Sequence, residues 1–168
     1  KSMKKLSVFC SLLLMVNIAG AADFLTDGKG SVNFRYRFEQ VDQTGIAEKA
    51  NASTLRTRLN YASGQDSNVG FFIEMDDVSY IGDDDFDSFR NGRTTYPVVA
   101  DPDGTGINQM YIDLNADAVK VRLGRQRINL DNQRFVGGVG WRQNEQTYDG
   151  LTLKTAGNDS FDFSYSFI

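Results

Sequence analysis

The 168-residue sequence contains no histidine, and its only cysteine is Cys10. Without histidine, the chain lacks the commonest general base and the commonest metal ligand. It also has only two prolines, and its one continuous apolar run, residues 6–16, is about half as long as a membrane-spanning helix needs. The lack of histidine in particular argues against an enzyme. We therefore expect no catalytic residue, no metal site and no cofactor.

The first residues have the composition of an export signal. Three lysines precede the apolar run, and the small residues Ala-Gly-Ala-Ala follow it at 19–22. A basic start, a short apolar stretch and a small-residue end are typical of a secretory signal peptide. We therefore predict a signal peptide over residues 1–22, Sec-type export, and a mature domain over residues 23–168. Removing residues 1–22 also removes Cys10, which excludes disulfides, cysteine-ligated metals and cysteine nucleophiles from the rest.

Charge makes nucleic acid an improbable partner. The predicted signal holds three of the 18 basic residues and none of the 22 acidic ones, so residues 23–168 carry 15 minus 22, a net charge of −7. Nucleic-acid binding requires a basic face. We expect no nucleic-acid partner.

Apolar and polar residues alternate with period two in segment after segment of residues 23–168. Such alternation places each set on one face of a β-strand, and no segment has an apolar stripe at helical spacing. Most predicted strands have about the ten residues that a tilted strand needs to cross a bilayer. We predict strands at residues 31–40, 53–63, 69–80, 107–115, 118–128, 146–155 and 159–168.

Long and short connections alternate between these strands. The long ones are residues 41–52, 81–106 and 129–145, and the short ones are residues 64–68, 115–117 and 156–158. This alternation is typical of outer-membrane barrels, whose outer loops are long and whose periplasmic turns are short. We therefore predict an all-β fold: an antiparallel transmembrane β-barrel of the outer-membrane porin type. Since seven strands is an odd number, we expect this barrel to be incomplete.

One face of the predicted strands carries charged residues in mid-strand, including Arg56, Arg58, Glu74 and Asp76. In a barrel, this face lines the lumen. In a soluble β-sandwich of the periplasm it would instead be the solvated face. Glu74 and Asp76 also have the spacing of a carboxylate pair, but the neighbouring arginines favour an ion-pair ladder over catalysis.

Two loop features leave alternatives open. The acidic residues of the 81–106 connection form a solvated loop, hold Ca²⁺, or fold into the pore and narrow it. Trp141, with Arg142 and Arg134, forms either an aromatic-cation platform for sugar or part of an interfacial girdle.

Several stretches resemble the alginate-export family of outer-membrane porins. They are VRLGRQRI at 121–128, QRFVG at 133–137, WRQ at 141–143, YDGL at 148–151, FRYRFE at 34–39 and NQMYIDL at 108–114. The resemblance implies a large monomeric barrel with an arginine-rich lumen. Arg125 and Arg127 share the parity of Leu123 rather than Arg122, so a bulge near Gly124 is needed to turn them inward. The predicted pore-lining residues are Arg35, Arg37, Arg56, Arg58, Glu74, Asp76, Tyr111, Asp113, Lys120, Arg122 and Arg125.

The functional prediction is a porin of the bacterial outer membrane that passes anionic small solutes or polysaccharide. Its partners would be outer-membrane lipid and those anions. The alternative is a non-conducting barrel that acts as an adhesin or a structural anchor. An open, charged lumen distinguishes the channel from a small barrel filled by side chains.

Overall fold

The computed structural model describes residues 27–64, 68–116, 118–155 and 163–168. Within them the chain is all-β, and no helix is long and apolar enough to span a bilayer. The strands are β1 (Lys29–Val41), β2 (Ala50–Ala62), β3 (Val69–Asp85), β4 (Gly104–Ala116), β5 (Val119–Gln126), β6 (Tyr148–Thr155) and β7 (Ser164–Phe167).

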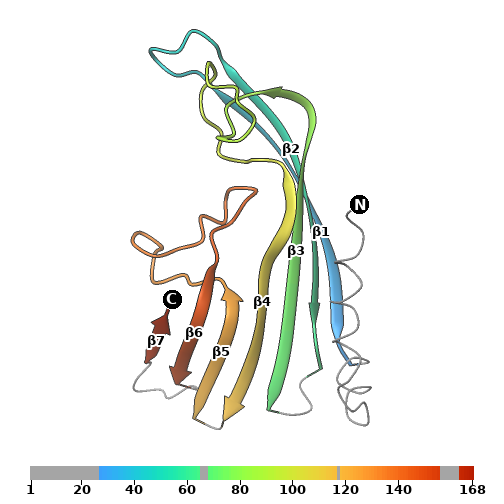
Figure 1. Cartoon of the computed structure of the whole chain (residues 1–168), viewed down its shortest axis with the longest axis vertical. Helices are drawn as coiled ribbons and strands as arrows, with labels where there is room; N and C mark the ends of the chain where they lie inside the picture. Colours follow the sequence, from blue (N-terminus) through green and yellow to red (C-terminus); the bar gives the residue numbers. More distant parts are fainter. Residues whose placement is uncertain (1–26, 65–67, 117, 156–162) are drawn as a thin grey trace, which may run out of the picture.

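The strands form one sheet in chain order, and every neighbouring pair is antiparallel. The connections after β1, β3 and β5 all lie at one end of the strands (Figure 1). Within the described residues the sheet is open, since β1 pairs only with β2 and β7 only with β6. This is the meander expected of a barrel wall, and the predicted fold class is confirmed.

Each predicted strand overlaps one observed strand, but the ends differ. β3 runs to Asp85 and β4 begins at Gly104, so the longest connection shrinks to residues 86–103. The extension of β3 is acidic, and Arg93 binds both Asp84 and Asp85 at 2.7 and 2.9 Å, which offsets their repulsion. β5 ends at Gln126 rather than at residue 128, and only residues 164–167 of the last predicted strand are assigned to β7. The predicted signal peptide, residues 65–67 and 117 of the predicted short connections, and residues 156–162 lie outside the described residues.

In a water-soluble sheet the apolar face is buried and the polar face is exposed. Here the apolar face is exposed and the charged face is buried. Phe34, Leu59 and Leu123 are 68, 51 and 57% exposed, whereas Arg56 and Arg58 are 5 and 8% exposed. The apolar core is correspondingly small. It comprises Ala50, Ala52, Phe86 and Val99, near the loop end of β2 and β3. We refer below to the apolar face, which carries Phe34 and Leu123, and to the polar face, which carries Arg56 and Arg58.

Candidate functional site

Ten of the eleven predicted pore-lining residues lie on the polar face. Residues that pair directly across neighbouring strands point to the same side of a sheet. Arg35 pairs with Arg56, Arg58 with Asp76, and Asp113 with Arg122. The ten residues are Arg35, Arg37, Arg56, Arg58, Glu74, Asp76, Tyr111, Asp113, Lys120 and Arg122.

Arg125 was predicted to share this face, and that prediction is wrong. Its cross-strand partners are Met110 and Asp149, and the register of β5 is unbroken on both sides. Arg125 therefore lies on the apolar face, where it forms a two-pronged ion pair with Asp149 at 2.8 and 2.9 Å. Gly124 does adopt a left-handed φ of +127°, but it does so without inserting an extra residue into the strand. Arg127 follows the end of β5 and turns onto the polar face there.

The arginines of the polar face are held by acids on adjacent strands. Arg58 donates from Nε and Nη2 to the two carboxylate oxygens of Asp76, both at 2.6 Å. Arg122 binds Asp113 in the same forked way at 2.7 and 2.8 Å, and its guanidinium lies 3.7 Å from the ring centre of Tyr111. Forked pairs of this kind fix both the position and the orientation of a guanidinium. Asp76 therefore acts as a partner of an arginine, as an ion-pair ladder requires.

A β-bulge brings amide groups into the same region. The register between β3 and β4 shifts at Glu74 and Met75, so that Asn108 is the extra residue on β4. Asn108 and Gln109 consequently both donate to Glu74 Oε1, at 2.8 and 3.2 Å. A bulge re-aims side chains in this way, and here it satisfies a carboxylate that is only 3% exposed.

Residues 127–147, which we call the covering loop, connect β5 to β6 and lie over the polar face of β1, β2 and β3. Gln143 is its fully buried anchor. Its amide nitrogen lies 2.9 Å from Thr54 Oγ1 and 3.1 Å from the Arg35 carbonyl oxygen, while its amide oxygen accepts from Arg35 Nε at 2.9 Å. The sequence left open that the 81–106 connection folds into the pore. In the structure both that connection, through Asp101 beside Arg37, and the covering loop contact the polar face.

A second anchor involves Trp141. Its ring has the guanidinium of Arg37 at 4.5 Å and that of Arg142 at 4.1 Å. The fully buried carboxylate of Asp101 lies 3.6 Å from both guanidinium groups and accepts from the Gln143 backbone N–H at 2.7 Å. Trp141 thus belongs to an aromatic-cation group on the polar face. The predicted third member, Arg134, instead lies over Phe135.

Glu145 is the carboxylate that the covering loop places among the strand arginines. It accepts from Arg58 Nη1 at 3.2 Å, from Asn108 Nδ2 at 3.3 Å and from Arg127 Nε, and Arg56 Nη1 lies 3.5 Å away. Its side chain is 7% exposed. A buried carboxylate is stable only when paired and hydrogen-bonded, and this one meets three guanidinium groups.

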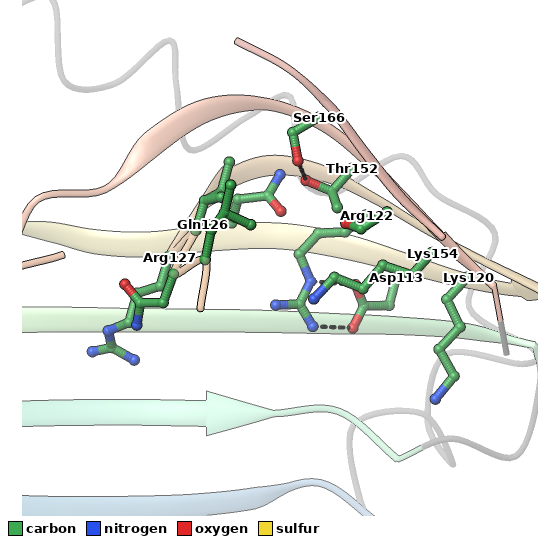
Figure 2. Close-up of a pocket in the computed structure, with 12 residues that line it drawn as sticks. Asp113, Lys120, Arg122, Gln126, Arg127, Thr152, Lys154 and Ser166 are labelled. Carbon is green, nitrogen blue, oxygen red and sulfur yellow. Dashed lines mark hydrogen bonds and ion pairs between the residues drawn. The ribbon is translucent and has the colours of Figure 1, made fainter. Parts of the chain in front are cut away.

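Farther along the sheet, the polar face is hollowed and cationic (Figure 2). A cavity of about 120 Å³ is bordered by Lys120, Arg122, Arg127 and Lys154, with Asp113 as its one acid. Lys120 and Lys154 pair directly across β5 and β6. Like charges in directly opposed positions repel, so this part of the face favours an anion between them.

Within the described residues, no group of three or more His, Cys, Asp or Glu side chains lies close enough to hold a metal ion. Asp84 and Asp85 bind Arg93, and Asp101 lies between Arg37 and Arg142. These carboxylates have arginine partners in place of a cation.

Sequence reasoning missed the residues that the covering loop contributes. Gln143 and Glu145 lie in a segment without periodicity, so nothing in the sequence indicates which strand they contact. Lys154, by contrast, could have been predicted from the sequence. It alternates with Leu151 and Leu153 on β6 and therefore lies on the polar face.

The comparisons with known proteins agree with this architecture. The sequence pattern of the family described as alginate export matches residues 28–166, which run from the start of the described sheet into β7. A search of curated proteins gave no match to this chain. The family is one of outer-membrane transport proteins rather than enzymes. A match over most of the chain, on an all-β meander, shows that the chain belongs to the alginate-export family of outer-membrane porins.

Proposed function

We propose that the polar face lines an aqueous channel that exports anionic solutes or polysaccharide, and that its cations favour anions. The observation that supports this most strongly is the reversed burial. Mid-strand arginines are covered while aromatic residues of the opposite face are exposed, an arrangement that suits a sheet with lipid on one side and a charged lumen on the other. Cations in a channel with low-dielectric walls act strongly on a passing ion.

Not every cation contributes equally to this field. Arg58 and Arg122 are each neutralised by a forked carboxylate. Within the described residues, by contrast, no ion pair involves Arg35, Lys120 or Lys154. We therefore assign most of the anion preference to these three residues. We propose that all ten predicted residues of the polar face line this channel.

Planar-bilayer reversal potentials of the full-length protein in a salt gradient test the proposal. The wild-type pore should prefer anions, and the triple variant Arg35→Gln, Lys120→Gln, Lys154→Gln should lose most of that preference. A matched control removes three cations from outside the polar face: Lys49→Gln, Arg93→Gln and Arg125→Gln. A cation-selective wild-type pore, or equal effects of the two triple variants, contradicts the proposal. Absence of any conductance would favour the non-conducting barrel.

A further inference from the structure

Arg56, Arg58 and Arg127 all contact the carboxylate of Glu145. Their remaining contacts are not equivalent. Two of them are fixed by acids of β3: Asp76 holds Nε and Nη2 of Arg58, and Glu74 holds Nη2 of Arg127. These contacts leave Arg58 Nη1 and Arg127 Nε directed at Glu145. The acids of β3 belong to the sheet, whereas Glu145 belongs to the covering loop and can leave with it.

Arg56 is incompletely satisfied in this arrangement. It is 5% exposed, and its contacts with Glu145 and with the Gln143 carbonyl oxygen are both 3.5 Å long. Its Nε is buried and has no acceptor within hydrogen-bonding distance. A buried donor without an acceptor is unfavourable, so the Nε–H group of Arg56 can donate a further hydrogen bond to an oxygen that enters the site.

The site also has an opening. Glu145, Asn108 and Asp76 border a hollow of about 230 Å³. A single water molecule needs about 10–15 Å³ on this scale, so a small carboxylate has room beside the Glu145 side chain. Of the donors that bind Glu145, Asn108 borders this hollow directly, whereas the three arginines lie behind the Glu145 carboxylate. A carboxylate entering there reaches the arginines only as Glu145 moves aside.

We propose that Arg56, Arg58 and Arg127 form a carboxylate-binding subsite whose resting occupant is the chain's own Glu145, and that a solute carboxylate displaces Glu145 and loosens the covering loop. The class of ligand is a solute carboxylate, whose two acceptor oxygens would take the place of those of Glu145 among the arginines. This inference rests on the proposed function, because a solute reaches the subsite only if the polar face lines an aqueous path.

The test follows the covering loop directly. A spin label is attached to a cysteine at Gln146, which is exposed and adjacent to Glu145, in a Cys10→Ser background. The full-length protein is reconstituted in liposomes. Label mobility is measured with sodium glucuronate, with sodium chloride at equal ionic strength, and with glucose. The chloride sample controls for screening, which weakens any ion pair.

Glucuronate should raise label mobility in the wild type more than chloride does, and glucose should have no effect. Glu145→Gln should raise mobility before any addition and abolish the response to glucuronate. Glu48→Gln, which neutralises an exposed acid of the β1–β2 connection, should behave as the wild type. An unchanged label in Glu145→Gln, or equal responses to glucuronate and chloride, overturns the inference. Anion conductance without a loop response refutes this inference alone, whereas a loop response without conductance refutes the proposed function alone.

Discussion

At the residue scale, the charge of Glu145 contributes to holding the covering loop on the polar face, beside the anchors at Gln143 and Trp141. The groups that face it are Arg56 and Arg58 on β2, Asn108 on β4 and Arg127, with Glu74 of β3 on the far side of Arg127. Burial alone would raise the pKa of Glu145, but the hydrogen bond and charge of Arg127, together with the charge of Arg58, outweigh it and lower the pKa below its ordinary value of 4.5. A carboxylate whose pKa is lowered on binding stabilises the bound loop at neutral pH.

The corresponding prediction is release of the covering loop by acid. The stabilisation is complete above the ordinary pKa of 4.5 and is lost as pH falls through the lowered value. Mobility of the Gln146 label should therefore stay low down to pH 4.5 and rise only below it. Glu145→Gln should show high mobility throughout, because it lacks the carboxylate whose protonation loosens the loop. A midpoint above pH 4.5 would contradict the lowered pKa.

At the scale of elements, Gly124 lets β5 pass closely against β4. Its φ is +127°, and a Cβ at this position would lie 2.4 Å from the Met110 carbonyl oxygen. Neither the backbone conformation nor the contact tolerates a side chain. The sequence pointed to Gly124 as a special position, but as a bulge that turns Arg125 inward. The structure gives it the different role of close strand approach.

Gly124→Ala should therefore destabilise the β4–β5 pairing, by roughly 1–3 kcal/mol for an alanine forced into such a conformation. Gly106→Ala on β4 is the matched control, since a Cβ there meets nothing within 4 Å. Urea unfolding of the protein in liposomes, followed by circular dichroism, measures both changes. Equal stability of the two variants would show that β5 can move away from Met110 at little cost.

Alternation predicted every strand because it depends on the residues of one segment. Phe34, Tyr36 and Phe38 are more exposed than the intervening Arg35 and Arg37, as the pattern indicates. The contacts of the covering loop were not predictable in this way. Gln143 bonds to Arg35, which lies 108 residues away, and a contact at that separation leaves no periodic trace in the chain.

The ends of β3 and β4 were also missed, because their residues have weak strand preference. Three consecutive aspartates end β3, and Gly104 and Gly106 begin β4. Aspartate and glycine are depleted in strands, so their pairing here depends on tertiary context, including Arg93 beside Asp84 and Asp85.

At the scale of the whole molecule, the apolar face should contact lipid. Ile112 lies on this face and pairs with Leu123, at the middle of β5. Ile112→Arg places a charge against hydrocarbon and should cost about 2–4 kcal/mol of folding free energy in liposomes. Asn33→Arg adds the same charge to the polar face and should cost less than about 1 kcal/mol, from repulsion by Arg58 opposite it. Urea titration of both variants measures the difference in folding free energy. Equal losses in the two variants would contradict the prediction that the apolar face contacts lipid.

The covering loop connects β5 to β6, yet Gln143 bonds to β1 and β2 at the other end of the strand series. Four strand spacings separate β1 from β5 in the sheet, about 19 Å at 4.8 Å each. The loop thus behaves as a tether between two distant parts of the wall. While Gln143 holds Arg35 and Thr54, β5 and β6 cannot splay away from β1 and β2. The spread of the wall is therefore limited by a loop, independently of pairing between its edge strands.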